Sequence, residues 1–220
     1  MSSASLVERL RRLDSCAISD ALDKLGLPAA VSGIAARTTR TRIGGRIVTV
    51  KLGPHVSGGA QSTRHLGTAA IEAAAPGEVI VLEQSTGIDA AAWGGVLSNA
   101  ARLKGLGGVI VEGPARDIDE ALELGFPVYA RSVTCRTARG RVQETATGGP
   151  VRVGDVGVAS GDFVLADSSG IVFLPAARVT EIVATAEAIA DREAAMTREL
   201  REGTPVGRVM GASYESMLKR

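Results

Sequence analysis

The chain has 220 residues, and its 25 Lys and Arg residues against 24 Asp and Glu residues give a formal net charge of +1. This balance creates no overall field that would attract nucleic acid or an anionic lipid surface. An aromatic content of 3% leaves few rings on which single-stranded nucleic acid could stack, so we expect no nucleic-acid partner. A hydrophobic content of 45% excludes a disordered chain and predicts a single domain over residues 1–220.

The sequence also argues against a membrane or secreted protein. Its apolar runs are far too short to cross a bilayer, and the N-terminus lacks the basic-then-apolar pattern of a signal peptide. Two cysteines, Cys16 and Cys135, are too few for a disulfide framework or a cysteine-based zinc site. We expect a cytoplasmic protein without a membrane partner.

The chain begins with two predicted short helices and a strand. The sequence from Ser5 to Glu8 has the capping-box pattern of a helix start, and a second helix over residues 18–25 ends at Gly26. Residues 46–52 have apolar side chains at every second position, which predicts a strand with one buried face.

Strands and helices alternate in the middle of the chain. The pattern predicts a helix over 63–75, a strand over 79–82, a helix over 94–104, a strand over 108–111, a helix over 117–124 and an extended segment over 127–130. Such alternation predicts helices that cover an at least partly parallel sheet.

The last third is rich in short strands and ends in a long helix. The predicted strands cover residues 151–153, 156–159, 163–166 and 171–174. The residues Asp167–Gly170 are typical of a tight turn, so the last two strands should form a hairpin. A helix over about 176–202 follows, with an apolar stripe along one face. The predicted fold class is α/β, a single mixed domain with a C-terminal helical arm.

The common catalytic templates are absent from the sequence. It contains no phosphate-binding loop ending in Gly-Lys-Ser/Thr, no Gly-x-Gly-x-x-Gly between a strand and a helix, and no Gly-x-Ser-x-Gly elbow. His55 and His65 lack the spacing of metal ligands, and we expect exposed or capping side chains. Lys51 lies opposite the apolar face of its strand, which favours a structural role over Schiff-base chemistry.

The strongest functional pattern spans residues 93–117. Gly94 and Gly95 precede a predicted helix, and a glycine pair at a helix N-terminus leaves backbone N–H groups open to a carboxylate. Arg116 and Asp117 follow a predicted strand, at the carboxyl end where α/β sheets usually bind ligands. Arginine binds a carboxylate through two hydrogen bonds, and one or two protein carboxylates are enough to hold a hydrated Mg²⁺ or Mn²⁺ ion.

The same residues also have a purely structural interpretation. Asp117 and Glu120 fit a capping box at the start of the next helix, and local sequence alone favours that interpretation. Gly94 and Gly95 equally permit close packing of the helix against a strand.

The stretch from Trp93 to Asp117 resembles the RraA-like family, and weaker similarities extend over nearly the whole chain. They lie in residues 18–22, 76–81, 124–130, 161–164 and 167–175. The family includes metal-dependent 4-hydroxy-4-methyl-2-oxoglutarate aldolases with oxaloacetate decarboxylase activity, and also regulators of ribonuclease activity. The resemblance implies a domain of the swivelling β/β/α type, assembled as a homotrimer or a dimer of trimers with sites near subunit interfaces.

The resemblance also assigns roles to individual residues. It implies that Arg116 binds substrate, that Asp117 binds the divalent metal cation, and that backbone groups of four residues hold the 2-oxo acid: Gly94, Gly95, Val96 and Leu97. Aldolase members often carry an acidic residue where this chain has Gly95. The proton-handling role assigned to that acid is therefore unfilled here.

Glu193 is a candidate for a substitute acid. It lies seven residues after Ala186 and seven before Leu200, on the apolar stripe of the terminal helix. An acid on that stripe needs a partner, such as a metal-bound water or an arginine of a neighbouring subunit. A catalytic role and an intersubunit ion pair both fit this position.

Together, these features predict a class II, divalent-metal-dependent lyase. It would cleave a C–C bond of a 2-oxo acid and leave a pyruvate enolate, whose charge Mg²⁺ and Arg116 stabilise, with Glu193 as a second catalytic candidate. The activity would be 4-hydroxy-4-methyl-2-oxoglutarate aldolase, oxaloacetate decarboxylase or both. The alternative is a non-catalytic regulator of ribonuclease activity, which would not need a metal-binding carboxylate.

Overall fold

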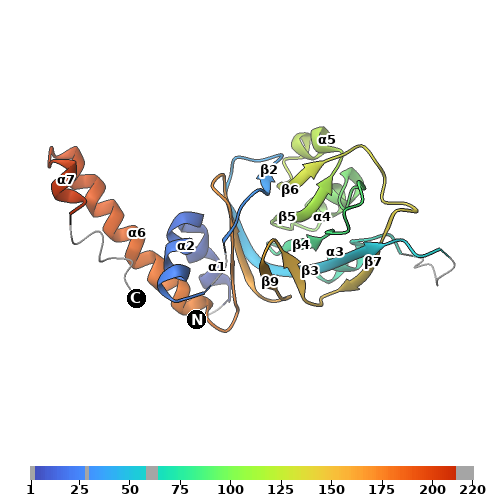
Figure 1. Ribbon diagram of the computed structural model, residues 1–220, viewed down its shortest axis with the longest axis horizontal. Coiled ribbons are helices and arrows are strands. Elements are labelled where there is room, and N and C mark those ends of the chain that lie inside the picture. Colours follow the sequence, from blue (N-terminus) through green and yellow to red (C-terminus); the bar gives the residue numbers. More distant parts are fainter. Residues whose placement is uncertain (1–2, 28–29, 58–63, 212–220) are drawn as a thin grey trace.

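One curved sheet organises the protein, as the computed structural model in Figure 1 shows. The structure describes residues 3–27, 30–57 and 64–211. Within them the strands are β1 (Ala30–Val31), β2 (Ala35–Ala36), β3 (Ile43–Pro54), β4 (Val79–Glu83), β5 (Gly108–Ala115), β6 (Val128–Val133), β7 (Val142–Thr147), β8 (Val151–Val153), β9 (Val156–Val158), β10 (Phe163–Ala166) and β11 (Ile171–Leu174). The helices are α1 (Ser3–Arg12), α2 (Ser15–Lys24), α3 (Thr68–Ala73), α4 (Gly95–Leu103), α5 (Ile118–Glu123), α6 (Val179–Arg201) and α7 (Val206–Val209).

The strand order in the large sheet is β1-β11-β10-β3-β4-β5-β6-β2, and β7 also pairs with β3. Strands β3, β4, β5 and β6 run parallel, whereas the pairings of β1, β2, β7, β10 and β11 are antiparallel. The 12-residue β3 joins the two parts, because residues 43–46 pair with β10 and residues 47–51 pair with β4. The sheet thereby curls into a half-barrel that helices cover (Figure 1).

The parallel strands are buried on both faces, as expected for strands covered by crossover helices. On one face, alternate residues of β4 and β5 pack with α3, α4 and α5. On the other face, the remaining residues pack against the small β8–β9 hairpin. Two buried acids hold that hairpin: Glu83 accepts a 2.8 Å hydrogen bond from Arg152 N, and Glu112 accepts one of 2.8 Å from Gly154 N.

Helices α1, α2 and the first half of α6 form a separate layer against β10 and β11. Arg9 of α1 binds Glu187 of α6 through Nε–Oε1 and Nη2–Oε2 contacts of 2.7 and 2.5 Å. The second half of α6 and α7 extend away from this layer (Figure 1), and the Leu200 side chain at that end is 40% exposed. In the described ranges no helix combines the length and apolar character needed to cross a membrane.

The observed elements confirm the predicted α/β class and most predicted segments. The apolar stripe of α6 is buried from Val179 to Ile189 but not at Leu200. The C-terminal part of the helix therefore extends beyond the hydrophobic core that its first half helps to form. The expected helix over 63–75 begins only at Thr68, after a left-handed Gly67, and residue 63 lies outside the described residues. The mostly polar β7 was not predicted, since its pairing with β3 rather than its own pattern makes it a strand.

Asp167 links the β10–β11 turn to the start of α2. Its carboxylate accepts hydrogen bonds from Ser15 Oγ at 2.7 Å, Ser15 N at 2.8 Å and Ser169 N at 2.9 Å. Burial raises the pKa of Asp167, but these bonds and one from the Gly170 backbone outweigh burial and lower the pKa below its ordinary 3.8. The charged form is therefore favoured by folding.

We predict that Asp167→Asn lowers the free energy of unfolding by about 1 kcal/mol at pH 7, after allowance for partial exposure. Because the folded-state pKa is the lower one, this contribution is complete above the unfolded-state pKa near 4 and disappears as pH falls through the folded-state pKa. Urea unfolding at several pH values measures it, with the exposed turn variant Asp155→Asn as control. An equal deficit at pH 7 and at acid pH would contradict the prediction.

Candidate functional site

The candidate site lies where the end of β5 runs beside the segment that leads into α4. Arg116 N donates to Trp93 O at 3.0 Å, and Ala92 N donates to Pro114 O at 2.8 Å. These backbone bonds place Gly94 and Gly95 next to Arg116 and Asp117. The spacing of these residues in the sequence could not establish that they are neighbours in space. The two glycines and the Arg–Asp pair singled out in the sequence therefore lie side by side.

A buried glutamine shapes the loop that delivers this segment. The Gln84 side chain is 3% exposed, and its Nε2 donates to Ile88 O at 2.9 Å and to Ala90 O at 2.8 Å. Its Oε1 accepts from both the backbone N and the Oγ1 of Thr86, at 3.2 and 3.0 Å. All four bonds lie within the loop, so one side chain fixes the path of residues 85–90 toward the site.

Asp117 adopts a left-handed backbone conformation, with φ 56° and ψ 42°. It is the only non-glycine residue with positive φ in the described parts of the chain. Such a conformation carries a backbone cost and often marks a functional position. Its effect here is to direct the side chain away from α5.

The predicted capping box at Asp117 is wrong. Asp117 occupies the N-cap position of α5 but makes no side-chain cap there. Instead, its Oδ2 accepts a 2.9 Å hydrogen bond from Gly95 N at the start of α4, and it lies 3.4 Å from Arg116 Nε. Glu120 accepts from Asn99 Nδ2 at 2.8 Å, so its carboxylate also faces α4. Both acids are directed to a neighbouring helix, which a local sequence pattern cannot reveal.

Gly94 and Gly95 allow these polar side chains to approach the backbone. A Cβ on Gly94 would lie 2.8 Å from Asp117 Oδ2 and 3.2 Å from Arg116 Nε. A Cβ on Gly95 would lie 1.8 Å from Glu120 Oε2. The close approach that the glycines permit is therefore to the charged side chains of Arg116, Asp117 and Glu120, and the expected close packing against a strand is not what brings these atoms nearest.

Trp93 forms the floor beneath the start of α4. Its ring is 1% exposed and stacks on Phe126 with centroids 6.3 Å apart. Its Nε1 donates to Ser98 Oγ at 2.9 Å, and Ser98 Oγ donates to Gly94 O at 3.2 Å. This chain of bonds fixes the first turn of α4, whose leading N–H groups have no acceptor within the helix.

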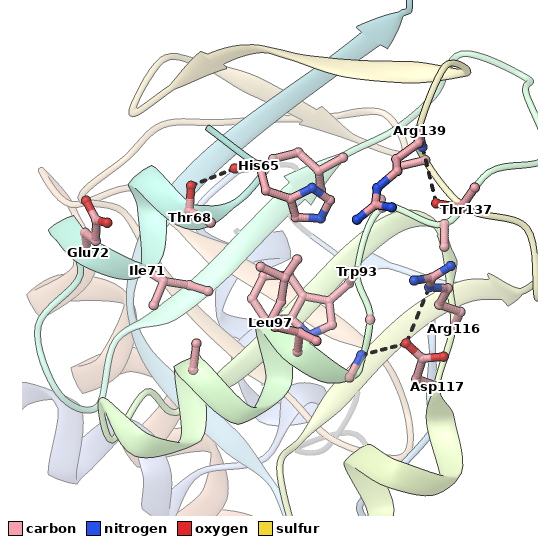
Figure 2. A pocket seen from close by; sticks show the side chains of 18 residues that line it. His65, Thr68, Ile71, Glu72, Trp93, Leu97, Arg116, Asp117, Thr137 and Arg139 are labelled. Atoms are coloured by element: carbon pink, nitrogen blue, oxygen red, sulfur yellow. Dashed lines mark hydrogen bonds and ion pairs between the residues drawn. The ribbon is translucent and has the colours of Figure 1, made fainter. Parts of the chain in front are cut away.

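A pocket of about 450 Å³ lies at this junction, lined in part by Trp93, Gly94, Gly95, Arg116 and Asp117 (Figure 2). Arg116 and Asp117 lie at one end of it, with Arg139 above them, and His65 lies between Arg139 and Thr68 in the same view. The lining also includes apolar side chains of Leu66, Ile71, Leu97 and Ala100. The pocket therefore combines a charged end with an apolar body, as small-molecule sites commonly do.

Sequence reasoning missed part of this pocket. His65 is exposed, as expected, but it also lines the cavity, and Thr137 and Arg139 reach it from the loop after β6. No local pattern marks these loop positions, because only the tertiary fold brings them beside α4. Lys51, in contrast, has the structural role expected of it, with Nζ 3.5 Å from Glu83 Oε2.

Six of the seven predicted site residues line this pocket: Gly94, Gly95, Val96, Leu97, Arg116 and Asp117. Glu193 does not join them within the chain, because α6 lies on the far side of the sheet from α4 and α5 (Figure 1). Burial raises the pKa of Glu193, and the negative charges of Asp20 and Asp14 raise it further. The charged neighbours that raise the pKa of this half-buried acid are thus acids of its own chain, so its predicted partner is not met within the chain's own pocket.

The side chains of the pocket fit a divalent cation that keeps most of its water ligands better than a cation whose ligands all come from the protein. In the part of the chain that the structure describes, no three His, Cys, Asp or Glu side chains form a metal-binding group. Mg²⁺ and Mn²⁺ need no such group, since Mg²⁺ commonly keeps several waters and binds through one or two carboxylates and substrate oxygens. The Asp117 carboxylate can serve as such a ligand. The space beside it is open because position 94 has no Cβ.

Comparisons with known proteins agree with the fold. Protein DlpA of Legionella pneumophila is 26% identical over 179 residues, which cover 81% of this chain but only 29% of that protein. A putative 4-hydroxy-4-methyl-2-oxoglutarate aldolase of Halalkalibacterium halodurans is 28% identical over 172 residues, 77% of this chain and 76% of that protein. The solved structure of Streptomyces coelicolor RraAS2, described as an unusual member of the RNase ES inhibitor RraA protein family, has a TM-score of 0.73 at 27% identity, covering 91% of this chain and 95% of that one.

A family model described as Aldolase/RraA matches residues 15–173. This range contains the whole half-barrel from β1 to β10, most of β11 and every described pocket residue. It confirms the resemblance found in the sequence. The chain belongs to the Aldolase/RraA family.

Proposed function

We propose that this protein is a divalent-metal-dependent lyase that cleaves a C–C bond of 2-oxo acids. The observation that carries the proposal is that Asp117 and Arg116 lie beside the N–H groups of the first turn of α4 at one end of the pocket. A carboxylate for a cation, a guanidinium for an anion and a helix N-terminus are complementary to a chelating 2-oxo acid.

Each group has a distinct part in this proposal. The N–H groups of Val96 and Leu97 would bind the substrate carboxylate at the helix N-terminus. Asp117 would hold Mg²⁺ or Mn²⁺, and the bound ion would supply electron withdrawal from the 2-oxo group. Arg116 would stabilise the negative charge that develops on the pyruvate enolate as the C–C bond breaks.

Both candidate reactions use the same charge stabilisation. Decarboxylation of oxaloacetate releases CO₂ and leaves the electron pair on the enolate, which is then protonated to pyruvate. Retro-aldol cleavage of a 4-hydroxy-2-oxo acid additionally requires removal of the hydroxyl proton by a base. Decarboxylation is therefore the less demanding activity for this site and the first one to measure.

A ribonuclease regulator is the second candidate, because the Streptomyces relative belongs to a family named for inhibition of RNase ES. A binding role would not require a carboxylate held in a left-handed conformation beside a helix N-terminus. The geometry of Asp117 therefore favours the enzyme.

We predict Mg²⁺-stimulated release of pyruvate from oxaloacetate, above the rate of the metal alone, that Asp117→Asn reduces by more than about 100-fold. The amide keeps the shape and an acceptor for Gly95 N but loses the charge. Coupled oxidation of NADH by lactate dehydrogenase follows pyruvate, and Asp119→Asn on the same helix is the control. Normal metal-dependent turnover by Asp117→Asn would refute the metal role and favour the regulator.

Arg116→Lys should lower kcat/KM nearly as much as Arg116→Ala, by roughly 10- to 1000-fold. Lysine retains the positive charge but not the planar fork that matches a carboxylate or enolate oxygen pair. Steady-state kinetics with the control Arg136→Lys, whose side chain pairs with Asp89, would test this. Kinetics near wild type for Arg116→Lys would reduce Arg116 to a general electrostatic contributor.

Glu193 enters the proposal through assembly as a homotrimer or a dimer of trimers. The arm of α6 would carry Glu193 to the Asp117 region of a neighbouring subunit as a proton-handling acid. We then expect Glu193→Gln to lower kcat without dissociating the oligomer. A mixture of Asp117→Asn and Glu193→Gln subunits should regain activity, because some interfaces pair two intact halves. Native mass spectrometry verifies that the subunits have mixed. If activity does not recover in the mixed oligomers, the whole site lies within one chain.

A further inference from the structure

The pocket extends beyond the groups that would hold the pyruvate half of the substrate. Arg116, Asp117 and the first turn of α4 lie at its charged end, and the cavity of about 450 Å³ continues along α4 to α3. In Figure 2, Leu97 lies between this charged end and Ile71 of α3. A volume in the range that encloses drug-sized ligands leaves room for a leaving group much larger than the CO₂ that oxaloacetate would lose.

We call the part of the pocket lined by α3 and the second turn of α4 its α3 side. In the described part of the chain it is lined by Thr68, Ile71, Glu72 and Ala100. None of these residues is basic. Glu72 is the charged one, and its ion-pair partner Arg64 does not line the pocket. A carboxylate bound on this side would lose water, meet no cation and lie near a like charge, so its burial would cost free energy.

The α3 side is built from the hydrophobic core and is therefore preformed. Ile71 and Leu97 are 6% and 5% exposed and belong to the core cluster between the sheet and its helices. Gly67 N, directly before α3, donates to Glu144 Oε2 of β7 at 2.6 Å, which fixes the start of α3 beside the pocket. Because these side chains are already packed, an apolar ligand group would gain contacts here without first ordering the wall.

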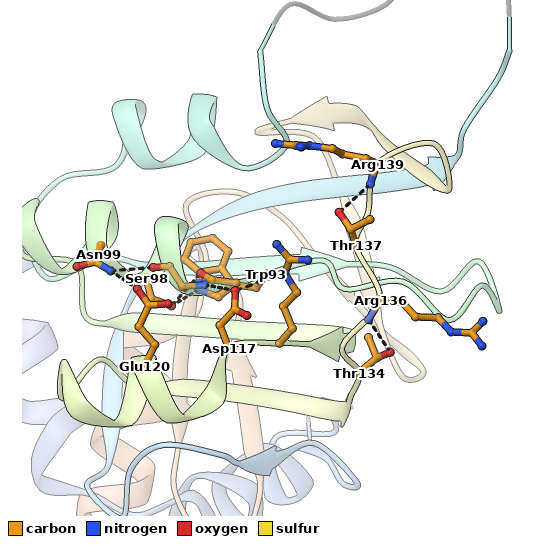
Figure 3. Close-up of polar contacts among 12 residues, drawn as sticks. Trp93, Ser98, Asn99, Asp117, Glu120, Thr134, Arg136, Thr137 and Arg139 are labelled. Atoms are coloured by element: carbon orange, nitrogen blue, oxygen red, sulfur yellow. Dashed lines mark hydrogen bonds and ion pairs between the residues drawn. The ribbon is translucent and has the colours of Figure 1, made fainter.

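Two arginines of the loop after β6 differ in direction, and neither supplies a cation to the α3 side. Arg139 lines the pocket, but it lies on the same side of Leu97 as Asp117 (Figure 2). Arg136 points away from Asp117 (Figure 3) and pairs with Asp89, with Nε and Oδ2 3.3 Å apart. Positive charge is thereby concentrated at the end that would take the carboxylate of the 2-oxo acid itself.

We propose that the leaving half of the substrate is uncharged and apolar, so that the substrate is a 4-hydroxy-2-oxo acid with an alkyl or aryl group on C4 and no second carboxylate. This inference rests on the proposed lyase function and adds its substrate class. In the cleavage, the C3–C4 bond breaks and its electron pair stays on C3 as the pyruvate enolate. The C4 hydroxyl loses its proton to Glu193 of a neighbouring subunit, and C4 becomes the carbonyl carbon of an apolar aldehyde or ketone. The enolate takes a proton at C3 and gives pyruvate.

Binding of 2-oxo acids that cannot be cleaved tests this class, by isothermal titration calorimetry on the full chain with Mg²⁺ at about pH 8, where histidines are ordinarily neutral. 2-Oxopentanoate and 2-oxoglutarate have the same chain length and differ in a terminal methyl or carboxylate group. We expect 2-oxopentanoate to bind about 10-fold more tightly. 2-Oxoheptanoate should bind more tightly still, by up to about fourfold per added methylene. A Kd for 2-oxoglutarate equal to or below that for 2-oxopentanoate would overturn the proposal, and a lower one would assign Arg139 to a second carboxylate.

A cation placed on the α3 side should reverse the preference. Ala100→Lys should tighten binding of 2-oxoglutarate and weaken that of 2-oxoheptanoate, each by about 10-fold, and should change the Kd of pyruvate by less than about twofold. Leu103→Lys adds the same charge on α4 at a position that is 89% exposed and outside the pocket, and should change each Kd by less than about twofold. Unchanged Kd values in a folded Ala100→Lys variant, checked by circular dichroism, would contradict the proposal. The comparison of ligands on the wild type needs no substitution and decides the matter if this variant does not fold.

The proposed function and the substrate class fail in different ways. If the protein releases pyruvate from oxaloacetate with Mg²⁺ but binds 2-oxoglutarate more tightly than 2-oxopentanoate, the substrate class is wrong and the lyase function stands. If apolar 2-oxo acids bind in the expected order but Mg²⁺ stimulates no pyruvate release, the lyase function is wrong and the apolar preference of the pocket stands. If no 2-oxo acid binds at millimolar concentration, both are refuted.

Discussion

The site depends on one contact, the docking of the first turn of α4 against the end of β5. Two backbone hydrogen bonds, from Arg116 N to Trp93 O and from Ala92 N to Pro114 O, align the segments. The bond from Gly95 N to Asp117 Oδ2 then closes the junction at the side-chain level. Because this junction places the Arg116 guanidinium and the Asp117 carboxylate beside the N-terminus of α4, a shift of either segment would separate these three groups.

The junction is supported from both sides by features with separate physical causes. Below it, Trp93 is buried on Phe126 and bonded through Ser98 to the start of α4. Beside it, the register shift in β5 between Val111 and Pro114 includes Gly113, which has a φ of 151° and whose missing side chain lets the strand pass close to Gln84 O. Such irregularities redirect side chains at the ends of strands. Here they turn the end of a core strand into a polar edge.

Much of this could be predicted from the sequence, because the core strands and their covering helices have strong periodic patterns. The glycine pair and the Arg–Asp pair were also recognisable, since each has a physical meaning at the end of a helix or strand. The direction in which the Asp117 side chain points could not be predicted, because the same local sequence fits both a capping box and a contact with the neighbouring helix. Only the left-handed backbone of Asp117, set by tertiary packing, decides between them. The contributions of His65 and Arg139 had no local pattern, as both reach the pocket from loops.

The departure at position 95 shows how a site can keep its charge while its residues change. The family resemblance leads one to expect an acid on α4 at this position, and its absence alone would weaken the case for an enzyme. The structure places the Glu120 carboxylate in the same volume from a different helix, with Asn99 as its anchor. A loss judged from one aligned position is therefore not a loss of negative charge in space. Whether a site of this kind has lost a charged group has therefore to be judged from the side chains that surround it in space, and not from one position of the sequence.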